Sequence, residues 1–187
     1  MKLNAKSNKF LTTFTIILGL MILYVHQMSP APVMGALSEE FGVTSDVLLN
    51  LSISITYPMT VIFSLLGPAI EQKIGTRKLY TLSLIIGSLG LLINFVIPNY
   101  TFFLIGRAMY GISFGLAMPF FGNAIAKWYS NRQKEALNTV NGLYPFIGTI
   151  ICYGVMFPLY ELFSNSNKGA YGIWGVFLLV LLIIWLF

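Results

Sequence analysis

The chain has 187 residues, of which 57% are hydrophobic and only 9% are charged, whereas an ordinary soluble domain carries about 25% charged residues. Eleven Lys and Arg against six Asp and Glu give a net charge of +5. The basic residues form short clusters between long apolar runs rather than one basic face, which argues against a nucleic-acid partner. The single cysteine, Cys152, excludes an intrachain disulfide. This composition predicts an integral membrane protein.

Apolar runs long enough to cross a bilayer occur six times. A hydrocarbon core of about 30 Å requires about 20 predominantly apolar residues per helix. The runs are continuous and show no two-residue alternation, which favours helices over barrel strands. We therefore predict an all-α fold, a polytopic membrane protein with six transmembrane helices. Their approximate limits are Phe10 through Val25 to the Leu37 region, Val47–Ile70, Leu79–Ile97, Phe102–Ala126, Ala136–Leu162 and Tyr171–Phe187.

The distribution of basic residues predicts the orientation, because cytoplasmic loops retain Lys and Arg. Lys168 lies on one side of the predicted membrane, Arg107 lies within a span, and nine basic residues lie on the other side. These nine are Lys2, Lys6, Lys9, Lys73, Arg77, Lys78, Lys127, Arg132 and Lys134. We expect a multi-pass protein of the cell membrane with a cytoplasmic amino terminus. A cleaved signal peptide is the alternative, but Met34-Gly-Ala36 makes a poor cleavage site.

Arg107 is the charged residue that falls inside a predicted span, about six positions or 9 Å from its outer end. Such a charge costs about 2.5–3.5 kcal/mol on insertion scales, so it normally faces protein or water. We favour a buried functional role over the alternative, in which the guanidinium snorkels to the interface. Tyr110, three positions on, is expected to share the same opening. One helical row runs along this span, through Arg107, Gly111, Gly115, Pro119 and Asn123, and predicts a close helix contact or a cavity wall.

His26 is the single histidine and lies at a depth similar to that of Arg107 if the first helix continues to about Leu37. It could carry a coupling proton or be a simple hydrogen-bonded residue. In the fifth span Asn138, Asn141 and Tyr144 share one face, either as a polar cavity wall or as interhelical hydrogen-bonding groups. The candidate substrate-binding residues are Arg107, His26, Tyr110, Asn141 and Tyr144.

Catalytic and metal-binding motifs are almost absent from the sequence. Gly111-Ile-Ser-Phe-Gly115 matches the nucleophile-elbow pattern, but that motif requires a strand-to-helix turn and a base, and this copy lies in the middle of an apolar run. No phosphate-binding loop, zinc motif or cysteine pair occurs. We therefore predict that the chain is not an enzyme and has no catalytic or metal-binding residue.

The segment between the second and third spans reads Gly67-Pro-Ala-Ile-Glu71-Gln-Lys73-Ile-Gly75-Thr-Arg77-Lys78. It resembles the signature loop of the major facilitator superfamily of secondary transporters, although Glu71 replaces the usual Asp, and Gln72 and Thr76 stand at positions that are usually basic. Gly106-Arg107-Ala-Met-Tyr-Gly111-Ile-Ser-Phe-Gly115 is similar to the second motif of that family. With six spans and an inside amino terminus, the resemblance covers the whole chain.

This resemblance implies the amino-terminal six-helix half of a transporter, built as two inverted three-helix repeats. It implies that spans one and four line a central cavity, with His26, Arg107 and Tyr110 there, and that spans three and six are peripheral. It also implies a gating loop against the other half, formed by Gly67, Glu71, Gly75, Arg77 and Lys78.

We therefore expect residues 1–187 to form one transmembrane bundle, truncated in the sixth helix, that moves a small solute by alternating access. Alternating access requires two bundles, so the partners are a missing carboxyl-terminal half or a second copy, besides the lipid bilayer and a small-molecule substrate. A small anion or carboxylate is favoured because Arg107 is a positive charge within a span and acidic residues are scarce in the spans. No cofactor is expected, only coupling to a proton or ion gradient. The alternative is a non-transporting fragment or an assembly or regulatory subunit.

Overall fold

A computed structural model describes residues 5–163 and 166–186 of the chain, and over these residues it contains helices and no strand. The predicted all-α class is therefore confirmed. The helices are α1 (Ala5–Met28), the short 3-10 helix η1 (Ala31–Val33), α2 (Met34–Phe41), α3 (Asp46–Ser54), α4 (Thr56–Ile74), α5 (Thr76–Val96), α6 (Tyr100–Trp128), α7 (Asn131–Leu162) and α8 (Asn167–Leu186).

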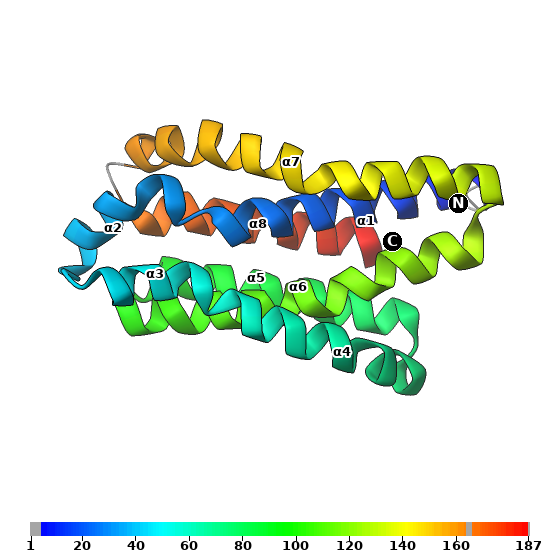
Figure 1. Cartoon of the computed structure of the whole chain (residues 1–187), viewed down its shortest axis with the longest axis horizontal. Helices are drawn as coiled ribbons and strands as arrows, with labels where there is room; N and C mark the ends of the chain where they lie inside the picture. The colour runs from blue at the N-terminus through cyan, green and yellow to red at the C-terminus, as the bar shows by residue number, and fades with distance from the viewer. Residues whose placement is uncertain (1–4, 164–165, 187) are drawn as a thin grey trace.

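Six of the described segments are long and apolar enough to span a membrane, as predicted. Their limits are Thr12–Phe41, Asp46–Ile74, Thr76–Ile93, Tyr100–Asn123, Asn131–Leu162 and Gly169–Leu186. They run lengthwise beside one another, and the two chain ends lie at the same end of the bundle (Figure 1), as an even number of crossings requires. The helix of the fifth span begins five residues earlier than predicted, at Asn131 rather than Ala136.

The first two spans are interrupted helices, and proline explains both interruptions. A proline has no N–H, so it leaves the carbonyl four residues before it without its helical donor. Pro30 follows α1 and precedes η1, which removes the donor for the carbonyl of His26. Pro58 lies in the first turn of α4, where proline is tolerated, and the break between α3 and α4 comes just before it. The first span therefore consists of α1, η1 and α2, and the second of α3 and α4.

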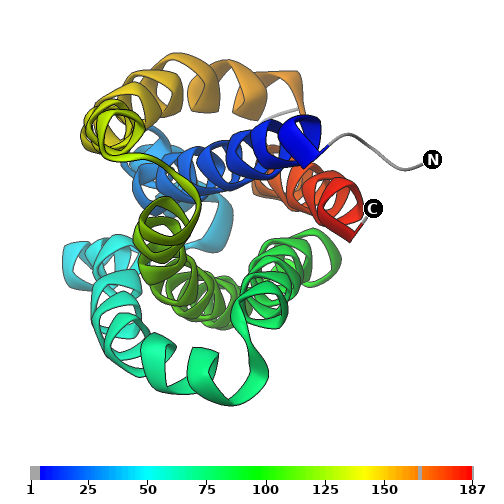
Figure 2. The same ribbon diagram turned by 90° about the vertical axis from the view of Figure 1, so that its right-hand side faces the viewer.

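Helix α6 lies at the centre of the bundle, between α4 and α5 on one side and α1 on the other (Figure 2). Small residues allow this close packing. Ser83 of α5 and Ser113 of α6 donate to each other's backbone carbonyls, at 2.9 and 2.7 Å. Helix α8 packs on α5, and α7 packs mainly on α1. The buried core accordingly runs through the middle of α1, α6 and α8.

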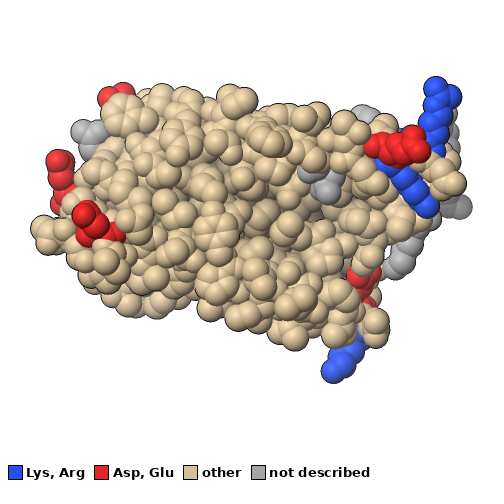
Figure 3. Space-filling model, viewed as in Figure 1, with Lys and Arg blue, Asp and Glu red and all other residues tan. Residues whose placement is uncertain are grey.

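Apart from the buried Arg107, the described charged residues gather at the two ends of the bundle and leave a broad uncharged band on the surface between them (Figure 3). We call one end the basic end, because it carries Lys73, Arg77, Lys78, Arg132 and Lys134, together with Glu71 and Glu135. We call the other the acidic end, because its described charged side chains are Glu39, Glu40, Asp46 and Glu161. An uncharged band between two charged rims is the surface expected of a membrane-spanning bundle.

Candidate functional site

Arg107 lies fully buried on α6, with a side-chain exposure of 0%. Its guanidinium donates to backbone carbonyls of two interrupted spans. Nε donates to Ser52 O at 2.7 Å, Nη2 donates to Gln27 O at 2.7 Å, and Nη1 donates to His26 O. Nη1 also lies 3.4 Å from Ser29 Oγ. Every hydrogen-bond partner of Arg107 among the described residues is therefore a neutral oxygen.

These carbonyls lie where the helices end, which explains why they accept from Arg107. His26 O has lost its helical donor to Pro30, and Ser52 O lies in the last turn of α3. The last turn of a helix also carries partial negative charge, which stabilises a cation placed there. The ring of Tyr110 lies 5.4 Å from the guanidinium carbon, within the range of a cation–π contact. Arg107 thus joins the breaks in the first and second spans.

The structure brings His26 and Tyr110 next to Arg107, and both are fully buried. The rings of Tyr110, Tyr171 and Trp174 surround the imidazole, with centroids 5.6, 5.5 and 5.7 Å away. Two of these rings belong to α8, so the sixth span contributes to the surroundings of His26. Sequence reasoning missed Tyr171 and Trp174, because an aromatic residue in an apolar run carries no signal of its partner.

The row of small residues on α6 forms a close helix contact rather than a cavity wall. A Cβ added to Gly111 would lie 2.6 Å from Thr56 O, and one added to Gly115 would lie 2.5 Å from Thr60 O. Thr60 Oγ1 also donates to Gly111 O at 3.2 Å. The backbones of α4 and α6 therefore touch along this row, and glycine is required for the approach.

The loop at the basic end is tied to its own bundle through Glu71. The carboxylate of Glu71, 8% exposed, accepts from Thr76 Oγ1 and from Asn123 Nδ2, each at 2.7 Å. Gly75 adopts a φ of +86°, a value that glycine tolerates. Arg77 Nη2 donates to Leu186 O at 2.9 Å. These contacts join the ends of α4, α5, α6 and α8.

Two other members of the predicted loop, Gly67 and Lys78, contribute differently. A Cβ added to Gly67 would lie 3.4 Å from Pro119 Cγ, an ordinary packing distance, and Lys78 is exposed.

Tyr144 and Asn141 lie on α7, apart from the hydrogen bonds of Arg107. Tyr144 is 8% exposed, and its ring meets that of Tyr24 edge-on at 5.7 Å. Tyr24 in turn contacts Phe114, which stacks on Tyr110, so a chain of rings links Tyr144 to the Arg107 site. The side chain of Asn141 lies outside the described part of the structure.

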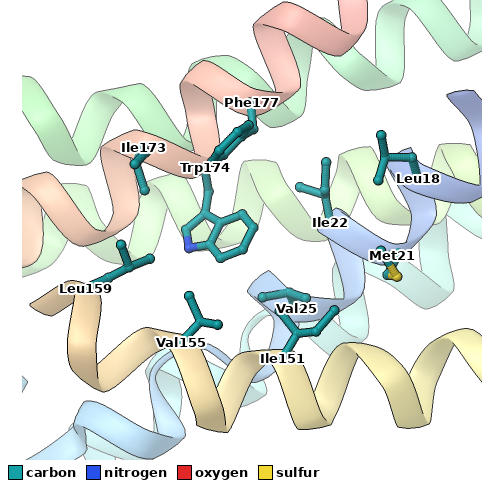
Figure 4. A pocket seen from close by; sticks show the side chains of 10 residues that line it. All are labelled: Leu18, Met21, Ile22, Val25, Ile151, Val155, Leu159, Ile173, Trp174 and Phe177. Atoms are coloured by element: carbon teal, nitrogen blue, oxygen red, sulfur yellow. The ribbon is translucent and has the colours of Figure 1, made fainter.

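An apolar groove of about 470 Å³ lies between α1, α7 and α8 (Figure 4). Met21, Val25 and Val155 line it, and Trp174 projects into it. The indole Nε1 of Trp174 is already used, because it lies 3.2 Å from Met156 Sδ. This groove suits an apolar chain and not a polar solute.

Interrupted helices that meet at a buried charge, inside a bundle of six helical segments able to span a membrane, define the class of this protein as a polytopic α-helical membrane protein. The chain belongs to the Major Facilitator Superfamily, whose sequence pattern it matches over residues 13–187. This family consists of solute transporters and is not enzymatic in general.

One curated relative is the D-xylose-proton symporter-like 2 protein of Arabidopsis thaliana. It is 29% identical to this chain over 92 residues, a stretch that covers 49% of this chain and 18% of the relative. The similarity therefore concerns a small part of the relative.

Proposed function

We propose that this chain forms one six-helix bundle of a secondary transporter, which moves a small solute by alternating access and is driven by a proton or ion gradient. Membership of the family supports solute transport in general. The second bundle, from further residues, another chain or a second copy, would complete the cavity. The second and fifth spans are the least buried of the six, and this leaves surface for such a bundle. We propose that the basic end of the bundle faces the cytoplasm.

The observation that carries the substrate proposal is the charge of Arg107. No carboxylate neutralises it among the described residues, since its partners are backbone and hydroxyl oxygens. Buried charge in a membrane protein acts over longer distances than it would in water. We infer that this positive charge favours a small anion or carboxylate as the transported solute, with Tyr110, His26, Asn141 and Tyr144 as further candidates for contact.

A neutral solute is the second candidate, and three observations favour it. The guanidinium already donates four hydrogen bonds within the chain. An arginine side chain has five N–H groups, so few N–H groups remain for a carboxylate. A cavity of about 620 Å³ at the acidic end is lined by Glu39 and Glu40, which would repel an anion that enters there. The name of the relative also refers to a sugar.

Uptake by the complete protein distinguishes these candidates. We expect vesicles with an inward proton gradient to accumulate lactate but not D-xylose, and an Arg107→Gln variant to lose at least 10-fold in initial rate, because a neutral amide removes the buried positive charge. Arg132→Gln, on the exposed start of α7, is the matched control and should transport normally.

Accumulation of D-xylose without lactate would contradict the anion proposal and leave the transporter proposal in place. Folded protein that accumulates neither probe would instead favour the alternative of an assembly or regulatory role. Unchanged lactate uptake by Arg107→Gln would remove Arg107 from the proposal.

A further inference from the structure

The apolar groove between α1, α7 and α8 has exposed walls and a buried floor. Val155 on α7 and Phe177 on α8 belong to its walls and are 37% and 50% exposed. On its floor Ile22 and Val25 of α1 are buried, and so is Trp174 of α8. The indole of Trp174 projects into the space between the helices (Figure 4). The groove is therefore a recess in the outer surface of the bundle, not a gap in its core.

The groove lies within the uncharged band of the bundle. On α7 it extends from Ile151 to Leu159, about 12 Å at 1.5 Å per residue, in the half of that helix nearer the acidic end. The described lining residues are all apolar, and the indole N–H of Trp174 already lies against Met156 Sδ. An ordered water needs two to four polar partners. The groove therefore suits hydrocarbon and not water.

Two features favour a lipid chain over a helix of a second bundle as the occupant. Helix α7 ends at Leu162 and α8 begins at Asn167, so a short connection holds the two walls together at the acidic end. A helix with its side chains is about 10–12 Å across, whereas an acyl chain is thin and flexible. The groove also lies away from the second span, the least buried of the six, because α8 and α4 lie on opposite sides of α6 (Figure 2).

We propose that an acyl chain of a membrane phospholipid lies in this groove, against Trp174 and between α7 and α8. Lipid tails are the solvent at this level of a membrane protein, and a groove left empty would lose the dispersion contacts of its lining. A chain in the recess contacts three helices at once, so it exchanges more slowly than lipid on a flat face. The proposal requires a bundle in a membrane and does not depend on which solute the complete protein transports.

Trp174 reports occupancy directly, because bromine atoms on a lipid chain quench the fluorescence of a tryptophan that they contact. The chain has three tryptophans, so Trp128→Phe and Trp185→Phe in the full chain leave Trp174 as the single emitter. In detergent, we expect phosphatidylcholine with brominated acyl chains to quench this emission at least twofold and to saturate at a low ratio of lipid to detergent. Absence of quenching, or quenching that rises with lipid without saturating, would overturn the proposal.

A variant that fills the groove tests where the chain lies. Val155→Phe, in the same single-tryptophan background, places a ring in the groove and should reduce the quenching at least twofold. Ile150→Phe is the matched control, because Ile150 is also on α7 but is 73% exposed and outside the lining. Equal quenching of the two variants would overturn the proposed position. Emission from Trp174 that is shielded from brominated lipid in a dimer and quenched in the monomer would instead assign the groove to a second copy.

Discussion

Replacement of Arg107 by methionine is expected to lower the free energy of unfolding by about 2–6 kcal/mol, since it leaves two buried carbonyls without a donor at about 1–3 kcal/mol each. These are the carbonyls of Gln27 and Ser52, whereas the carbonyl of His26 keeps the hydroxyl of Ser29 as a donor at 2.8 Å. Two of the six spans would lose the group that joins their interrupted ends. Unfolding in increasing fractions of SDS, followed by circular dichroism, measures this change.

Arg132→Met is the matched control, because Arg132 is exposed at the start of α7, and we expect it to change stability by less than about 0.5 kcal/mol. Methionine at position 107 removes a costly buried charge, and such replacements are stabilising in some proteins. An Arg107→Met variant as stable as the wild type would therefore show that the fold does not depend on this arginine, and would leave binding as the reason for its presence.

Gly115→Ala is expected to destabilise the bundle by about 1–3 kcal/mol, the usual cost of overpacking. The new Cβ would lie 2.5 Å from Thr60 O and 3.0 Å from Phe63 Cβ. The first of these atoms is backbone, so α4 and α6 must move apart. The same SDS titration measures the loss.

Gly122 offers a control on the same helix, because a Cβ there would meet nothing within 4 Å. Gly122→Ala should be neutral or stabilising by up to about 1 kcal/mol, since alanine is the better helix former. Equal stabilities of the two alanine variants would contradict the close contact between α4 and α6.

The sequence predicted the six spans because length and apolar composition decide membrane insertion on their own. The sequence predicted that the first span continues to the Leu37 region, and the structure interrupts it on the way with η1, just after Pro30. The break between α3 and α4 was missed, although Pro58 carried a signal for it: a proline removes the donor for the carbonyl four residues earlier. The helix of the fifth span begins at Asn131, earlier than the predicted Ala136, because the polar residues after Asn131 form the first turns of α7.

The candidate site was predictable only in part. The burial of Arg107 followed from its charge in an apolar run, and its proximity to His26 from their similar depth. Its partners did not follow, because backbone carbonyls have no side-chain signature in a sequence. The row of small residues on α6 was compatible with either a helix contact or a cavity wall. The close approach of α4 to α6 in the structure shows that it is a helix contact. Tyr171 and Trp174 required knowledge of how α8 packs on the rest of the bundle.

The central claim is a six-span bundle whose basic end faces the cytoplasm, and cysteine labelling in intact cells tests it most directly. Cys152 is buried and can be replaced by alanine as a background. Single variants Arg77→Cys and Arg132→Cys mark the basic end, and Glu39→Cys and Asp46→Cys mark the acidic end. A membrane-impermeant maleimide should label the two acidic-end variants at once and the two basic-end variants only after permeabilisation. Labelling of one variant from each end in intact cells would contradict the bundle, and the reversed pattern would contradict its orientation.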